Sequence, residues 1–335
     1  MSNPTLHDVA RAAGVSYSTA DRVLNERGGV AAKSIQRVQR AIQELGYRRD
    51  IRAANLSRRR SYRFAVFLPQ GDHGFFSSLG QALLAQAEAR AADRVSVTLC
   101  DPSRPDDAIR EGGEWDCAAL VGTESEGLAQ VMAELTDRGI PAITLVSDID
   151  GSRRGYVGID NTVAGRTAGR LLRLAHGRGA GRILPVLGSL SLRDHRERLD
   201  GAAEVLAAPG SRLVLLPPVE VHDQPDRMRD RLDAALRADA GITGIYSIGA
   251  GNRGLIALME AGGEGRPFVV LHELTPHSRA ALERDLIDVV IDQKPAEEAA
   301  RALDAMRAIA DGEEPPAAVI TPAIFFKENL PGVPA

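Results

Sequence analysis

Residues 5–25 read TLHDVARAAGVSYSTADRVLN, and this stretch decides how the N-terminal part of the chain is interpreted. Thr5 can cap a first helix, with Asp8 at the third helical position as in a capping box. Gly14 permits the left-handed turn that ends such a helix. Ser16 can then cap a second helix. The stretch predicts two short helices joined by a glycine-containing turn.

A third helix completes this unit. Residues 31–45 place Val38 and Ile42 at helical spacing, and Gly46 closes the helix. Two helices joined by such a turn form the helix-turn-helix arrangement, and a generic three-helix bundle is the alternative. The many arginines of so small a unit favour a nucleic-acid function. They are Arg11, Arg22, Arg27, Arg37, Arg40, Arg48 and Arg49.

The net charge of −4 is an average over two parts of opposite sign. The first 60 residues hold 12 Lys and Arg against five acids, a net +7, and the remainder carries −11. A small basic unit joined to a large acidic one indicates a polyanion-binding head and a body that binds something else.

The stretch 5–25, followed by IQELGY, resembles the DNA-binding head of the LacI/GalR family of bacterial transcription regulators. The resemblance implies a homodimer on double-stranded operator DNA, with the second helix in the major groove. Arg22 has the guanidinium fork that pairs with guanine. The DNA-contacting residues that the resemblance implies in this head are Thr5, Ser16, Tyr17, Ser18, Thr19, Arg22 and Asn25.

Two positions depart from the family pattern. Asp21 stands where relatives usually have Ser, and it either orients Arg22 or accepts from a cytosine amino group. Ala31 replaces a capping Ser and forfeits about 1 kcal/mol of local stability.

Residues 50–61 form a linker with two possible readings. By composition, the segment is a charged, solvated connector. The family resemblance instead implies a hinge helix that forms on specific DNA. In that reading Leu56, beside Ala53, wedges into the minor groove and bends the duplex.

From residue 62 onward, β-rich runs alternate with amphipathic helices, which predicts parallel sheets with helices on both faces. The expected strands are 62–68, 95–100, 117–122, 141–146, 182–188, 212–217, 244–248, 267–272, 286–292 and 317–326. The expected helices include 77–93, 125–138, 161–177, 194–208, 223–240, 275–284 and 295–312. So long an α/β body favours two lobes over one sheet, and a TIM barrel is the competing fold.

The strings YVGIDNTVAGRTAG, HELTPHSRAAL and VIDQKPAEEA are similar to the sugar-binding fold of the family's effector domains. The fold class expected is therefore α/β: an all-α helix-turn-helix head, then a two-lobed, periplasmic-binding-protein-like body. We expect domains at 1–49, 50–61 and 62–335. Within the body, lobe one takes 62–160 and 293–322, and lobe two takes 161–292.

Ligands of such sheets lie beyond the carboxyl ends of the strands. After the first strand, His73 can hydrogen-bond, and the Phe75-Phe76 pair offers an apolar wall for a sugar ring, although both rings could simply pack beneath their loop. Val146-Ser147 replaces the frequent Asp-Arg of relatives, which puts a simple hexose or pentose in doubt. The expected effector-binding residues are His73, Phe75, Phe76, Ser147, Asp148, Arg196, Asn252, Glu273 and Gln293.

Two other classes of function compete with a regulator. Residues 249–254, GAGNRG, fit the dinucleotide fingerprint, but they follow a late strand rather than the first one. A free periplasmic receptor would need a secretion signal, and Asp8 and Arg11 interrupt the start of the chain. We therefore expect a cytoplasmic, ligand-responsive transcription regulator, acting as a repressor, with a small sugar-like effector. We expect it not to be an enzyme and to have no cofactor, metal site or membrane segment.

Overall fold

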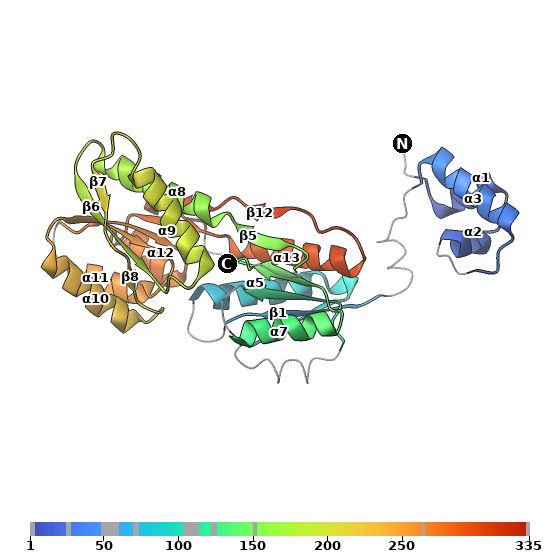
Figure 1. Cartoon of the computed structure of the whole chain (residues 1–335), viewed down its shortest axis with the longest axis horizontal. Helices are drawn as coiled ribbons and strands as arrows, with labels where there is room; N and C mark the ends of the chain where they lie inside the picture. Colours follow the sequence, from blue (N-terminus) through green and yellow to red (C-terminus); the bar gives the residue numbers. More distant parts are fainter. Residues whose placement is uncertain are drawn as a thin grey trace. The chain divides into compact units, whose positions relative to one another are not determined.

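The computed structural model describes residues 4–24, 28–47, 60–69, 74–102, 114–121, 126–149, 153–262 and 265–332. The chain divides into two compact units, Met1–Arg60 and Ser61–Ala335. We call them the head and the body (Figure 1).

The head consists of helices α1 (Leu6–Ala13), α2 (Tyr17–Leu24) and α3 (Ala32–Leu45) around a small core. Its local signals act as predicted. Thr5 and Asp8 form the capping box of α1, and Gly14 adopts φ 61° at its end. The Oγ of Ser16 accepts from the Thr19 N–H at 3.2 Å at the start of α2. Ala31 makes no side-chain cap on α3.

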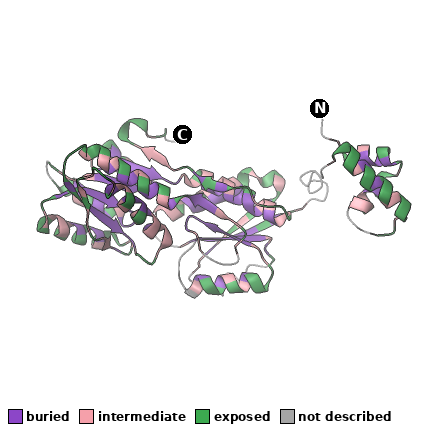
Figure 2. Cartoon of the chain, turned by 45° about the horizontal axis from the view of Figure 1, so that its top comes forward, coloured by how far each residue is buried: buried purple, intermediate pink, exposed green. Residues whose placement is uncertain are grey.

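Lobe one of the body is built on a parallel six-stranded sheet in the order β12-β5-β4-β3-β1-β2. In chain order its strands are β1 (Tyr62–Phe67), β2 (Val95–Cys100), β3 (Cys117–Val121), β4 (Ala142–Leu145), β5 (Tyr156–Ile159) and β12 (Ala318–Ile320). Helices α5 (Gly74–Ala89) and α13 (Pro295–Ala310) cover one face, and α7 (Glu126–Asp137) covers the other. Buried strand residues therefore lie between helices on both sides (Figure 2).

Lobe two holds a seven-stranded sheet in the order β13-β11-β10-β9-β6-β7, and β8 also pairs with β6. The pairs are parallel except β13 with β11. The strands are β6 (Gly181–Leu187), β7 (Leu213–Leu215), β8 (Val219–Glu220), β9 (Ile242–Ser247), β10 (Phe268–His272), β11 (Val289–Asp292) and β13 (Ala323–Phe325).

Helices cover both faces of this second sheet. The pair α8 (Asn161–His176) and α9 (Arg193–Leu206) packs on one face. On the other face lie α10 (Pro225–Ala238), α11 (Asn252–Ala261) and α12 (Pro276–Glu283). The chain passes between the lobes three times, after β5, after β11 and after β12.

Three sequence expectations need correction. The single strand expected at 317–326 is two strands, β12 in lobe one and β13 in lobe two, because Pro322 cannot continue a ladder and the chain changes sheets there. The short strands β5 and β8 were missed. Helix α5 begins at Gly74, not at residue 77, because Phe75 and Phe76 extend its apolar stripe back by one turn.

Helices α8 and α9 touch backbone to backbone because a glycine on each helix faces the backbone of the other. A Cβ added to Gly201 would lie 2.2 Å from the carbonyl oxygen of Thr162. One added to Gly165 would lie 2.0 Å from the carbonyl oxygen of Arg198. No side chain can give way at such contacts, so the residues at these two positions set the position of α9.

We predict that Gly201→Ala lowers the free energy of unfolding of the body by about 1–3 kcal/mol, because the methyl group forces α8 and α9 apart. Urea unfolding followed by circular dichroism measures the change. Gly262→Ala is the control, since its Cβ meets nothing closer than 3.5 Å. Equal stability of the two variants would contradict the packing argument.

Candidate functional site: the cavity between the lobes

A cavity of about 340 Å³ lies in the body, lined by residues of both lobes. Its lining comes largely from segments that follow the carboxyl ends of parallel strands, where ligands of such sheets bind. The volume falls in the range of small-molecule sites. The lining residues that the argument uses are Phe75, Phe76, Ser147, Asp194, His195, Arg198, Asp223, Asn252, Glu273 and Gln293.

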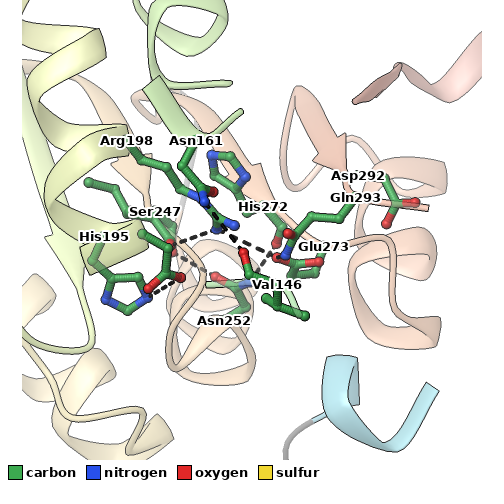
Figure 3. Close-up of polar contacts among 12 residues, drawn as sticks. Val146, Asn161, His195, Arg198, Ser247, Asn252, His272, Glu273, Asp292 and Gln293 are labelled. Carbon is green, nitrogen blue, oxygen red and sulfur yellow. Dashed lines mark hydrogen bonds and ion pairs between the residues drawn. The ribbon is translucent and has the colours of Figure 1, made fainter. Parts of the chain in front are cut away.

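Arg198 of α9 is the central residue of this cavity and is only 1% exposed (Figure 3). Its Nε donates to Oδ1 of Asn161 at 2.8 Å, and its Nη1 donates to the carbonyl oxygen of Ile248 at 3.3 Å. Its Nη2 is buried without a hydrogen-bond acceptor among the described residues. The guanidinium is thus fixed on two sides and has one donor group left for a ligand.

Glu273 follows β10 with φ 79° and faces Arg198, with Nη1 and Oε1 3.6 Å apart. Gln293 donates from Nε2 to the same Oε1 at 2.7 Å. Burial raises the pKa of Glu273 to about 8, and the nearby Asp292 adds to the increase, against the attraction of Arg198. Oε2 of Glu273 and Oε1 of Gln293 have no partner among the described residues.

Ser147 and Asn252 both line the cavity, but they differ in whether their side chains have hydrogen-bond partners among the described residues. The hydroxyl of Ser147 is buried and has no hydrogen-bond partner in the described part of the chain. The amide of Asn252 is engaged, since it accepts from Ser247 Oγ at 2.6 Å and donates to the His272 carbonyl oxygen at 3.0 Å. Ser147 can therefore bind a ligand directly, whereas Asn252 mainly holds the loop after β9.

Phe75 and Phe76 form the apolar wall. They lie in the first turn of α5, not in a loop, with ring centroids 5.4 Å apart in an edge-to-face arrangement. Both pack on the core of lobe one and both line the cavity. Packing on the core therefore does not keep the two rings out of the cavity lining, and their contact with a sugar ring stays a prediction.

Two expected residues do not line the cavity. Nη1 of Arg196 donates to the carbonyl oxygens of Leu190 and Ser191 at 2.7 and 2.9 Å, and Arg198 occupies the place expected for Arg196. The carboxylate of Asp148 accepts from Thr144 and Arg153, each at 2.6 Å.

Asp194 and His195 line the cavity and were not predicted as site residues. His73 lies outside the described residues. The sequence signal that could have identified Asp194 and His195 is their position as a polar pair in the first turn of a helix that follows a β-strand.

The glycines of the GAGNRG string serve packing around the cavity. Gly249 adopts φ 107°, and a Cβ at this position would lie only 3.2 Å from Nη1 of Arg198. The glycine therefore leaves room for the guanidinium. Gly251 precedes α11 in the left-handed region. A Cβ on Gly254 would lie 1.9 Å from the carbonyl oxygen of Pro225, so this glycine permits the contact of α10 with α11. Each glycine therefore has a structural reason that needs no dinucleotide.

The head presents α2 as a polar surface. Ser18 and Arg22 are exposed and lie four residues apart, on one face of the helix. Tyr17 is 47% exposed and packs its ring on His7, with centroids 4.4 Å apart. Ser16 bonds to both Ser18 and Thr19 through its hydroxyl. The expected contacts Asn25, Ala53 and Leu56 lie outside the described residues, as does most of the expected hinge.

Comparisons with known proteins agree with both units. The lacI family of bacterial regulatory proteins matches residues 5–50, and the periplasmic binding protein domain matches residues 64–314. The chain belongs to the periplasmic binding protein domain family, whose model covers three quarters of it, and its head matches the lacI family model. The resemblance and the fold class inferred from the sequence are thereby confirmed.

Curated relatives in this family are regulators. The chain is 25% identical to the HTH-type transcriptional regulator DegA of Bacillus subtilis, over 62% of this chain and 61% of that protein. It is 26% identical to the ribitol operon repressor of Klebsiella aerogenes, over 48% of this chain and 60% of that protein. The chain thus spans about three fifths of these relatives. Both names agree with a regulator rather than an enzyme.

The body also matches solved structures of binding proteins. GanP, a glucose-galactose binding protein from Geobacillus stearothermophilus, aligns with a TM-score of 0.72 at 20% identity, covering 81% of this chain and 99% of that one. At this identity the match shows the fold of the body alone. Within the described ranges, no helix is long and apolar enough to cross a bilayer.

We predict that Glu273→Gln changes how the stability of the body depends on pH. With a folded pKa of about 8, Glu273 keeps its proton while the unfolded chain loses it near its ordinary pKa of 4.5. Glu273 therefore contributes a loss of stability of roughly 1 kcal/mol per pH unit as pH rises from about 5 to 8, and the variant lacks this contribution.

Melting temperatures measured from pH 5 to 9 test this. The exposed Glu88→Gln serves as the control and should follow the native profile. Parallel profiles for native protein and Glu273→Gln would show that the Glu273 carboxyl does not titrate in this range.

Proposed function

We propose that this protein is a transcriptional repressor that binds a pseudo-palindromic operator as a homodimer and responds to a small sugar-like effector in the cavity of its body. It would act in the cytoplasm. The observation that carries the proposal is the convergence of unpaired polar atoms on a cavity with a phenylalanine wall. They belong to Ser147, Arg198, Glu273 and Gln293.

The chemistry of the cavity suits a polyhydroxylated ring or chain. Arg198 Nη2 donates, Gln293 Oε1 accepts, and the hydroxyl of Ser147 does both. Glu273 with its proton can donate as well as accept. Phe75 and Phe76 offer apolar surface to C–H groups. One relative is named for a ribitol operon, and GanP for glucose and galactose, which supports the same class of effector.

DNA binding is assigned to the head. Its net charge of +7 supplies the attraction to phosphates. We assign base reading to the exposed face of α2, with Arg22 on guanine and Ser18 beside it. Thr5, Ser16, Tyr17, Thr19 and Asn25 are assigned to orientation on the duplex, and Ala53 with Leu56 to the hinge wedge in the minor groove.

The effector response follows from where the cavity residues lie. Asn161 stands at the first passage between the lobes and bonds to Arg198. Gln293 stands at the second passage and bonds to Glu273. A ligand that contacts Arg198 and Glu273 therefore acts on both passages, and it favours whichever lobe arrangement lets it make all its contacts.

We expect Arg22→Ala to weaken binding to a specific operator about 10- to 100-fold, because a bidentate guanine contact carries about 1–3 kcal/mol of discrimination. Fluorescence anisotropy with operator and random duplexes measures both affinities. Arg40→Ala, an exposed arginine of α3, removes the same charge and should affect both duplexes alike. Equal losses on both duplexes for Arg22→Ala would refute base reading by this residue.

We expect Phe76→Ala to abolish the effector response while operator binding survives. A thermal-shift screen of sugars and polyols identifies compounds that stabilise the body, and operator binding is then measured with and without each one. Phe326→Ala, a phenylalanine that is 40% exposed and outside the cavity lining, is the control. If Phe76→Ala responds like the native protein, the effector binds elsewhere.

A further inference from the structure

The start of α9 contributes a carboxylate to the cavity that the argument so far leaves without a role. Asp194 is the second residue of α9, and its side chain is 13% exposed and lines the cavity. In the part of the chain that the structure describes, its carboxylate accepts no hydrogen bond. Nε2 of His195 lies 3.9 Å from its Oδ2, which is too long for a hydrogen bond.

His195 does not neutralise this carboxylate. Its Nδ1 faces the N–H of Ser189 at 3.4 Å and accepts from it, which leaves the ring proton on Nε2, toward Asp194. Burial lowers the pKa of His195, so the ring is uncharged at neutral pH. A neutral N–H donor and the carboxyl group of Asp194 therefore lie side by side at the cavity wall.

The charges around the cavity are unequal. Among the described lining residues, Arg198 is the one lysine or arginine, against the acids Asp194, Asp223 and Glu273. With Glu273 protonated, the lining still holds two other carboxyl groups, those of Asp194 and Asp223, against one guanidinium, and Asp223 accepts from the Gly251 N–H at 2.6 Å.

We propose that Asp194 and the Nε2–H of His195 form a ligand-binding subsite, and that the effector is an uncharged or basic polyhydroxyl compound rather than a sugar acid or sugar phosphate. The inference rests on the proposed function and narrows its ligand class. A hydroxyl or ammonium group of the ligand donates to Asp194, and a ligand oxygen accepts from His195. An added anion would meet excess negative charge in a buried site.

The test uses the full chain and a matched panel of probes. The uncharged and basic probes are D-glucose, D-galactose, sorbitol, ribitol, myo-inositol and D-glucosamine, and the anionic probes are D-gluconate and D-glucose 6-phosphate. Thermal shift ranks the probes, and calorimetry gives their dissociation constants. Asp194→Asn keeps the shape of the side chain and removes its charge, with Asp194→Ser as a second variant. Asp200→Asn, exposed on the same helix, is the matched control.

The expected result is binding by uncharged or basic probes, at least 10-fold weaker in both Asp194 variants and unchanged in Asp200→Asn. Preferred binding of gluconate or glucose 6-phosphate would overturn the proposal. So would unchanged affinity in the Asp194 variants, or no binding by any uncharged or basic probe.

Arg198→Lys separates this proposal from the proposed function. A probe that needs Arg198 but not Asp194 refutes the subsite alone. If a probe binds with the same affinity to the Arg198 and Asp194 variants as to the native protein, the effector binds outside this cavity. That result refutes the cavity assignment as well as the subsite.

Discussion

The buried guanidinium of Arg198 joins three segments of lobe two at the cavity: the start of α8, the loop after β9 and the residue that follows β10. It bonds to Asn161 at one passage between the lobes, and it faces Glu273, which Gln293 bonds at another. A buried charge of this kind is costly unless its surroundings compensate it, so its neighbours are constrained as well. The glycine contacts of α8 with α9 set where this side chain starts. The geometry of the site therefore depends on how closely two helices of lobe two can approach.

On the proposed function, the same arrangement lets a small ligand in the body affect the DNA affinity of the head. Contacts with Arg198 and Glu273 bear on residues at the passages, where a change in lobe orientation must be accommodated. On the proposed function, the ligand only has to prefer one orientation. A shift from nearly full to nearly no operator occupancy needs a difference in ligand affinity of about 10⁴ between the two states. Several hydrogen bonds made in one orientation only are enough for that.

Local signals in the sequence predicted most elements, because capping residues and apolar spacing act within a few residues. The site was predicted less well. Arg196 and Arg198 lie two residues apart on α9, so they point to nearly opposite sides of the helix. Which of them faces the cavity depends on the packing of α9 on α8, which no local pattern encodes. Likewise, Val146 turns into the left-handed region at φ 68°, and this turn precedes both the inward Ser147 and the outward Asp148.

The cost of the cavity is itself an argument for binding. Each buried polar atom left without a partner costs about 1–3 kcal/mol, and four residues of this cavity carry such atoms. Gly188 and Gly249 keep the space open, since a Cβ at these positions would lie 2.8 Å from His195 and 3.2 Å from Arg198. A fold under selection for stability alone would close this space with apolar side chains. The buried polar atoms that lower the stability of the body are therefore those that can form hydrogen bonds with a polyhydroxyl ligand. The same hydrogen bonds would give the ligand its affinity and would stabilise the body.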